Sequence, residues 1–424
     1  MSVSRRSFLE NGASAALLSA LGWTGCASSP ARGETLPPWR PGNFDLHFIY
    51  TGCGENLFYR LPDGTSVLND VGEFYRPRSL VDVPLLPSAE RLGGDWVARY
   101  LRRVYDEKTI DYAVFTHWHS DHIGHYSEEP ESAEAAFRWR VTSGGRKVNG
   151  FLCVAEEYDV RTCFDHQFPA RNAYGSGDSS VLLLDAWART RRGAVREPFR
   201  VGACDQIRLV RDPASYRGVF SVRNVTANAV AWDGANGAVD FGAEHVAVTG
   251  TGSLSQNVLS ATMLFRYGKF SYFASGDLQT QVFRRKDGTS VDFETYVADR
   301  IGPVTLCKMG HHGCSNAMNA AFVRGVRADA YVACMWCPTQ AYPDVLSRIN
   351  AVPSAASGRR PLILPQLTCR LQRDWFAANR PDEVPPSGVH VVVRVAPGGG
   401  SYRVYLLDAR DEEMRIVATF DRDC

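Results

Sequence analysis

Short apolar segments separated by turn residues recur along most of this 424-residue chain. Four early segments have the alternating or continuous apolar positions of strands: 44–50, 56–61, 66–71 and 108–115. Pro62-Asp63-Gly64, between the second and third, has the composition of a hairpin turn. Residues 96–105 instead carry apolar side chains at helical spacing. Strands mixed with helices in this way predict an α/β fold.

Between residues 127 and 240 the apolar pattern is less regular. It favours a helix at 133–138, a strand at 150–154 and a second helix at 182–192. Further along, the pattern predicts strands at 257–267, 270–274, 304–309 and 328–334, and a helix at 319–326. Three alternating segments at the end of the chain predict an antiparallel meander: 390–396, 402–407 and 414–420.

The first thirty residues have the pattern of an export signal. Arg5 and Arg6 precede an apolar run that ends at Trp23, which is too short to span a membrane. The arginine pair followed by Ser-Phe-Leu resembles the twin-arginine class of signals and predicts a periplasmic or cell-envelope location. Thr24-Gly25-Cys26 also resembles a lipoprotein cleavage site, which leaves open a lipid anchor at Cys26. Residues 31–43 are rich in proline and read as a linker.

The amino-acid composition excludes few classes of function. The net charge of +1 gives no strong nucleic-acid signal. Arginines gather at 189–200, where a solvated surface and a phosphate clamp are both open interpretations. Eleven cysteines in a chain of this length are too few for a disulfide scaffold, and the pair Cys334 and Cys337 is interpreted as packing.

Four ligand-type side chains fall within six positions directly after the strand at 108–115: His117, His119, Asp121 and His122. Residues two apart face the same side of an extended chain, so His117 and His119 can bind one metal together. A turn into a helix then directs Asp121 and His122 toward a neighbouring site. Imidazole and carboxylate groups suit Zn, with Mn or Fe as alternatives. This segment predicts a metal site.

Two further segments can complete such a site. Asp277 follows the strand at 270–274, and His311 and His312 follow the strand at 304–309. A carboxylate at a strand end can bridge two cations. Alone, each segment would be weak evidence, because strand-end aspartates and surface histidine pairs are common. In this order along the chain, after the segment that begins at His117, they become candidate ligands.

These motifs together resemble those of metallo-β-lactamase-fold hydrolases, and most closely the hydrolase domain of competence-type DNA-uptake proteins. The resemblance is carried by Thr51–Asn56 with Leu61–Gly64 and Asp70–Gly72, by His117–His122, by Asn257 and Ser260 ahead of Ser275–Asp277, and by Lys308–Gly313. It implies a four-layer αββα sandwich over residues 44–345. The C-terminal β extension, residues 346–424, is expected to pack on the same domain.

The resemblance also implies roles for the candidate ligands. It places His117 and His119 on one metal and Asp121, His122 and a later histidine on the other, with Asp277 between the two. His311 is the preferred later histidine and His312 the fallback. Many members of the family carry a third histidine for the first metal, and near that point this chain has Asn257. Asn257 or water is therefore expected to fill the place, with one or two Zn ions bound.

The function implied is hydrolysis by a metal-activated hydroxide that Asp121, as the catalytic residue, would orient. A phosphodiester-type substrate is the leading expectation, and an ester, lactone or β-lactam substrate on the same fold is the first alternative. The second alternative is a non-catalytic metal-binding protein. The sequence does not indicate an oligomeric state.

Overall fold

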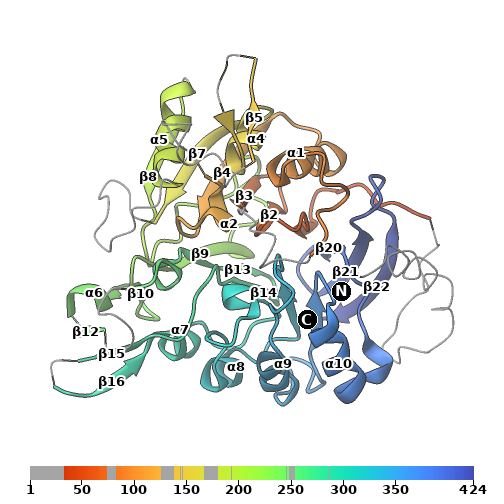
Figure 1. The fold of residues 1–424 in the computed structure, drawn as a ribbon. Coiled ribbons are helices and arrows are strands. Elements are labelled where there is room, and N and C mark those ends of the chain that lie inside the picture. The colour runs from red at the N-terminus through yellow and green to blue at the C-terminus, as the bar shows by residue number, and fades with distance from the viewer. Residues whose placement is uncertain are drawn as a thin grey trace, which may run out of the picture.

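Two large β-sheets and the helices on their outer faces make up most of the computed structural model (Figure 1). It describes residues 33–73, 83–125, 138–143, 145, 147–166, 180–191, 193–244, 246–247, 254–285 and 287–424. The chain is thus a mixed α/β protein, as the pattern of apolar positions predicted.

The first sheet has nine strands in the order β22-β21-β20-β1-β2-β3-β4-β7-β8. Their bounds are β1 Phe44–Phe48, β2 Asn56–Arg60, β3 Ser66–Val71, β4 Thr109–Phe115, β7 Asp159–Asp165, β8 Val195–Pro198, β20 Val389–Val395, β21 Ser401–Asp408 and β22 Ile416–Asp423. Neighbours from β22 to β3 pair antiparallel, and those from β3 to β8 pair parallel. The predicted C-terminal meander is therefore confirmed, and it extends this sheet beside β1.

The second sheet has eight strands in the order β11-β10-β9-β13-β14-β17-β18-β19. Their bounds are β9 Phe220–Ala227, β10 Val230–Trp232, β11 Ala238–Asp240, β13 Thr262–Tyr267, β14 Phe270–Ala274, β17 Leu306–Lys308, β18 Ala330–Ala333 and β19 Leu362–Pro365. There are also two small sheets. One has three strands, β12 Val246–Ala247, β15 Val282–Arg284 and β16 Ser290–Asp292, and the other pairs β5 Arg140–Val141 with β6 Lys147–Val148.

Helices cover the outer face of each large sheet (Figure 1). Helices α1 Gly93–Val104, α4 Phe151–Ala155 and α5 Ser180–Thr190 pack on the first sheet. Helices α7 Phe293–Ile301, α8 Ala320–Val326, α9 Pro343–Asn350 and α10 Arg370–Asn379 pack on the second. A third apolar cluster joins side chains of both sheets, such as Phe48 and Tyr272. This layering is compatible with an α/β sandwich.

Two elements differ from their predictions, and others lie outside the described residues. The strand predicted at 257–267 begins only at Thr262, because Gln256–Leu259 form a short 3-10 helix. Residues 150–154 were predicted as a strand, but α4 occupies Phe151–Ala155. All five of its residues are buried, so the segment has no polar face. Without one, the spacing of apolar residues cannot distinguish a helix from a strand. The predicted helix at 133–138 falls almost entirely outside the described residues, as do the export signal and Cys26. Within the described ranges, none of the helices has the length and apolar character needed to cross a membrane.

The candidate site residues follow strands of both large sheets at their carboxyl ends. Strand β4 leads into the short helix α2 Ser120–Ile123, β14 leads to Asp277, and β17 leads to the turn η5 Gly310–Gly313. Another short turn, η4 Gln256–Leu259, precedes β13. The two sheets are joined at this edge by a hydrogen bond from Ala261 N to Thr116 O, 2.8 Å long. The fold therefore gathers segments far apart in sequence at one place.

Candidate metal centre

Four side-chain atoms converge at this edge: Nε2 of His122, Nε2 of His312, Oδ2 of Asp277 and Oδ2 of Asp121. His122 Nε2 lies 3.1 Å from Asp277 Oδ2, 3.3 Å from His312 Nε2 and 3.7 Å from Asp121 Oδ2. His312 Nε2 lies 3.3 Å from Asp277 Oδ2 and 3.1 Å from Asp121 Oδ2. A tetrahedral zinc ion with bonds of about 2.0–2.1 Å separates its ligand atoms by about 3.3 Å. These five separations are close to that spacing, so the side chains can together hold a metal ion.

Two glycines let the loop that carries Asp121 and His122 lie against the first sheet. A Cβ atom at Gly72 would lie 1.9 Å from Asp121 O, and one at Gly54 would lie 2.3 Å from it. Both contacts are shorter than any side chain allows. The backbone of Glu55 also donates a hydrogen bond to Asp121 O, 2.8 Å long. The glycines in the segments 51–56 and 70–72 therefore set the position of the ligand loop.

Hydrogen bonds behind the two imidazoles orient their Nε2 atoms toward the centre. His122 Nδ1 lies 2.9 Å from Asp70 Oδ2, and Asp70 in turn accepts from the hydroxyl and backbone N–H of Thr116. His312 Nδ1 lies 2.9 Å from the carbonyl oxygen of Cys334. With the proton on Nδ1, each ring presents the lone pair of Nε2, which is the form that binds metals.

The charges of these side chains favour a bound cation. Burial alone would lower the pKa of both imidazoles, but Asp277 and Asp121 outweigh it, raising the pKa of His122 well above its ordinary value and that of His312 to about 9. Burial would also raise the pKa of both aspartates, yet the two histidines hold the pKa of each below its ordinary value. A divalent cation can replace the protons that the imidazoles hold between these carboxylates.

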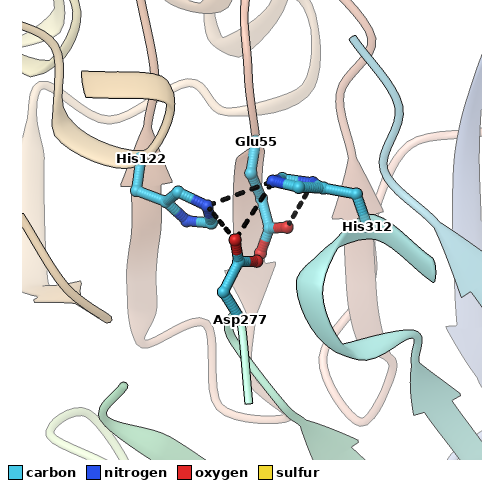
Figure 2. A group of neighbouring side chains, drawn as sticks. All are labelled: Glu55, His122, Asp277 and His312. Atoms are coloured by element: carbon cyan, nitrogen blue, oxygen red, sulfur yellow. Dashed lines mark hydrogen bonds and ion pairs between the residues drawn. The ribbon is translucent and has the colours of Figure 1, made fainter. Parts of the chain in front are cut away.

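Glu55 belongs to the same buried group, and the sequence analysis did not single it out. One ligand atom from each of Glu55, His122, Asp277 and His312 lies within 4.8 Å of the others (Figure 2). However, Glu55 Oε2 is 2.5 Å from Lys308 Nζ and 3.5 Å from His312 Nδ1, the ring nitrogen that faces away from the four converging atoms. Glu55 therefore supports His312 from behind. Its position in the segment 51–56 is the sequence signal that could have identified it.

Lys308 balances the buried carboxylates. Its ammonium lies 3.3 Å from Asp277 Oδ1 and donates to the carbonyl oxygen of Gly276 at 2.6 Å. Burial would lower the pKa of Lys308, but Glu55 and Asp277 raise it above its ordinary value. Asp277 thus presents Oδ2 to the centre and Oδ1 to Lys308. A bridge from Asp277 to a second cation would have to use Oδ2 alone.

The variant Lys308→Met is expected to lower the free energy of unfolding by about 3–5 kcal/mol, because it leaves a buried carboxylate without its counter-charge. Denaturant unfolding measures this loss. The double variant Glu55→Gln/Lys308→Met removes both charges of the closest pair and should recover more than half of it. An equal loss in the single and double variants would show that the ion pair is not the cause.

His117 and His119 form a second pair of facing imidazoles. His117 Nε2 lies 2.9 Å from His119 Nδ1, and the ring of His117 is fully buried. Its other nitrogen lies 3.1 Å from Thr116 Oγ1. Among the described residues, no other histidine, cysteine or carboxylate joins both rings in a group of ligand atoms within 4.8 Å of one another. The structure therefore brings these two predicted ligands together without a third of those types.

The sequence-based preference for His311 over His312 is revised by this geometry. Both residues have positive φ angles, 45° and 54°, and only the side chain of His312 reaches the four-atom centre. His311 Nδ1 lies 2.8 Å from Asn316 Oδ1, and its Nε2 lies 3.0 Å from Asn257 Nδ2. Both nitrogens of His311 are therefore occupied by amide groups. The oxygen of Asn257 is buried, and none of the described residues donates a hydrogen bond to it.

Comparison with known proteins adds no relative: no protein-family model matches the chain, and no curated protein matches it. The class that the fold and the site define is a mixed α/β protein with a buried group of histidine and carboxylate side chains that can hold a metal ion.

Proposed function

We propose that this protein is a metal-dependent hydrolase of the metallo-β-lactamase superfamily. The observation that carries the proposal is the convergence of atoms from His122, His312, Asp121 and Asp277, with five of their pairwise separations between 3.1 and 3.7 Å. The order of the motifs along the chain and the compatibility of the layers with an αββα sandwich support the same family.

In this proposal the four side chains hold one cation, for which two imidazoles and two carboxylates favour Zn, with Mn or Fe as alternatives. His117 and His119 would hold a second cation. The buried oxygen of Asn257, which has no hydrogen-bond partner among the described residues, could serve as a further ligand. The first of these sites offers four protein ligands and the second fewer, so we expect the first to bind metal more tightly.

The chain's own residues support a hydrolytic role for this centre. A bound divalent cation would supply a Lewis acid that polarises the substrate and lowers the pKa of water toward neutrality. The side chain of Asp121 is 9% exposed, against 1% or less for His122, His312 and Asp277. It is therefore the member of the set that substrate and water reach first. Because His122 and His312 hold its pKa below the ordinary range, Asp121 stays ionised at neutral pH and can accept a hydrogen bond from a water molecule.

For the substrate we propose a phosphodiester, and the support is the resemblance of the motifs to the competence-type group. The arginines at 189–200 add none. Arg196 is buried and bonded to Asp165 and Asp185, and Arg200 lies 3.1 Å from Asp205. Arg196 is thus engaged by carboxylates within the protein, and the Arg200 pair is solvent-exposed, so neither contact supports a phosphate clamp.

The purified protein loaded with Zn, and then with Mn, is expected to hydrolyse bis(p-nitrophenyl) phosphate and to show little or no turnover of a β-lactam. Second-order rate constants on both substrates measure this preference. Faster cleavage of the β-lactam with either metal would reject the phosphodiester assignment. Tight metal binding without turnover of phosphodiester, ester or β-lactam substrates would instead favour a non-catalytic metal-binding protein.

A further inference from the structure

Trp336 places an indole N–H against the candidate metal centre. The residue lies in the loop after β18, two residues beyond Cys334, whose carbonyl oxygen orients His312. Its Nε1 lies 3.2 Å from His312 Nε2, and the two rings meet edge to face with centroids 5.9 Å apart. Trp336 is only partly buried. The indole N–H of a partly exposed side chain therefore lies beside one of the four converging atoms.

The loop that carries Trp336 is held by contacts of its own. The backbone N–H groups of Trp336 and Cys337 both donate to Gln340 Oε1, at 2.6 and 2.9 Å. The carbonyl oxygen of Gln340 accepts from Gln372 Nε2 of α10 at 2.6 Å. The backbone of Trp336 is thus anchored to the second sheet's helical layer. Its position does not depend on the hydrogen bond to His312 alone.

His312 Nε2 has a single lone pair, so once it binds a cation it cannot accept a hydrogen bond from Trp336. The indole N–H would then be able to donate to an oxygen of a ligand bound beside the cation. We infer that Trp336 is a specificity-determining residue, which donates a hydrogen bond from Nε1 to an anionic oxygen of a ligand bound at the metal centre. This inference rests on the metal centre of the proposed function.

The chemistry of the surroundings indicates an oxyanion of the phosphoryl or carboxylate class. An indole N–H is a donor that cannot accept and does not titrate, so it selects an acceptor oxygen at any working pH. Asp121 and Asp277 at the same centre would repel an anion, and the Lys308 ammonium is engaged by Glu55 and Asp277. A neutral donor at Trp336 favours the anion without competing with the cation for its ligands.

The test compares Trp336→Phe with the unaltered protein, using Zn and inorganic phosphate as the probes. Calorimetry with a competing chelator gives the Zn affinity, and calorimetry on the Zn-loaded protein gives the phosphate affinity. The variant is expected to bind Zn as tightly as the unaltered protein, because the indole is not one of the metal ligands. Phosphate affinity is expected to fall roughly tenfold, the usual effect of losing a hydrogen bond to a charged group.

Trp232→Phe is the matched control, because Trp232 is also partly buried but donates to the carbonyl oxygen of Ala235 in β10's following turn. It should leave both affinities unchanged. Weaker Zn binding by Trp336→Phe would overturn the inference in favour of a structural role for the indole. Unchanged phosphate affinity, or no phosphate binding by the unaltered Zn-loaded protein, would also overturn it. These readouts do not use turnover, so a failure of the proposed hydrolase activity remains a separate result.

Discussion

The variant Asp277→Ala is expected to lose its bound metal and, with it, any hydrolytic activity. Asp277 Oδ2 lies 3.1 Å from His122 Nε2 and 3.3 Å from His312 Nε2, so it is a central member of the four-atom set. Its removal leaves one carboxylate, Asp121, to balance a divalent cation at this centre. Elemental analysis of the purified protein and the rate on bis(p-nitrophenyl) phosphate are the two measurements.

A matched control for this variant is Asp287→Ala, which removes a fully exposed aspartate from the turn after β15. It should retain the metal content and the rate of the unaltered protein. An Asp277→Ala protein that folds and holds as much metal as the control would mean that Asp277 is not a ligand. The metal assignment of the whole set would then need another carboxylate in its place.

The second prediction concerns the adjacent residues His311 and His312. His312→Ala is expected to abolish metal binding and activity, whereas His311→Ala should keep most of its metal. The two side chains differ in what they reach: His312 Nε2 lies within 3.3 Å of atoms from Asp277 and His122, and His311 is bonded to Asn257 and Asn316. Metal content and second-order rate constants of the two variants, measured side by side, check the difference.

Because the two residues are adjacent and of one type, each variant is the control for the other. The opposite order, with the metal lost from His311→Ala and kept by His312→Ala, would transfer the ligand role to His311. Equal loss in both variants would indicate that the turn Gly310–Gly313, not one imidazole, determines metal binding. Circular dichroism of both proteins separates loss of metal from loss of fold.

Much of the fold could be predicted because its strands carry clear local signals. The C-terminal meander alternates apolar and polar residues, and β20, β21 and β22 pair antiparallel as expected. The error at 150–154 has a physical cause. Helix α4 is one short turn buried on all sides, and burial on all sides removes the difference between a period of 2.0 and one of 3.6.

The candidate site was predictable where ligands lie close together in sequence and less so where the backbone decides their direction. His117, His119, Asp121 and His122 follow one strand, and their residue types alone suggest a metal. Which of His311 and His312 reaches the centre depends on the left-handed backbone conformation of both residues. The residue types at these positions do not indicate that conformation. Glu55 lies behind His312 because of where β2 begins, and Trp336 lies beside His312 because of where β18 ends. Such contacts depend on tertiary packing.

The most direct test of the central claim is anomalous X-ray diffraction at the zinc edge from crystals of the Zn-loaded protein. We expect an anomalous peak at bonding distance, about 2.0–2.2 Å, from His122 Nε2, His312 Nε2, Asp277 Oδ2 and Asp121 Oδ2. A fully loaded protein whose zinc lies elsewhere, or whose zinc is bound by His311 in place of His312, would contradict it.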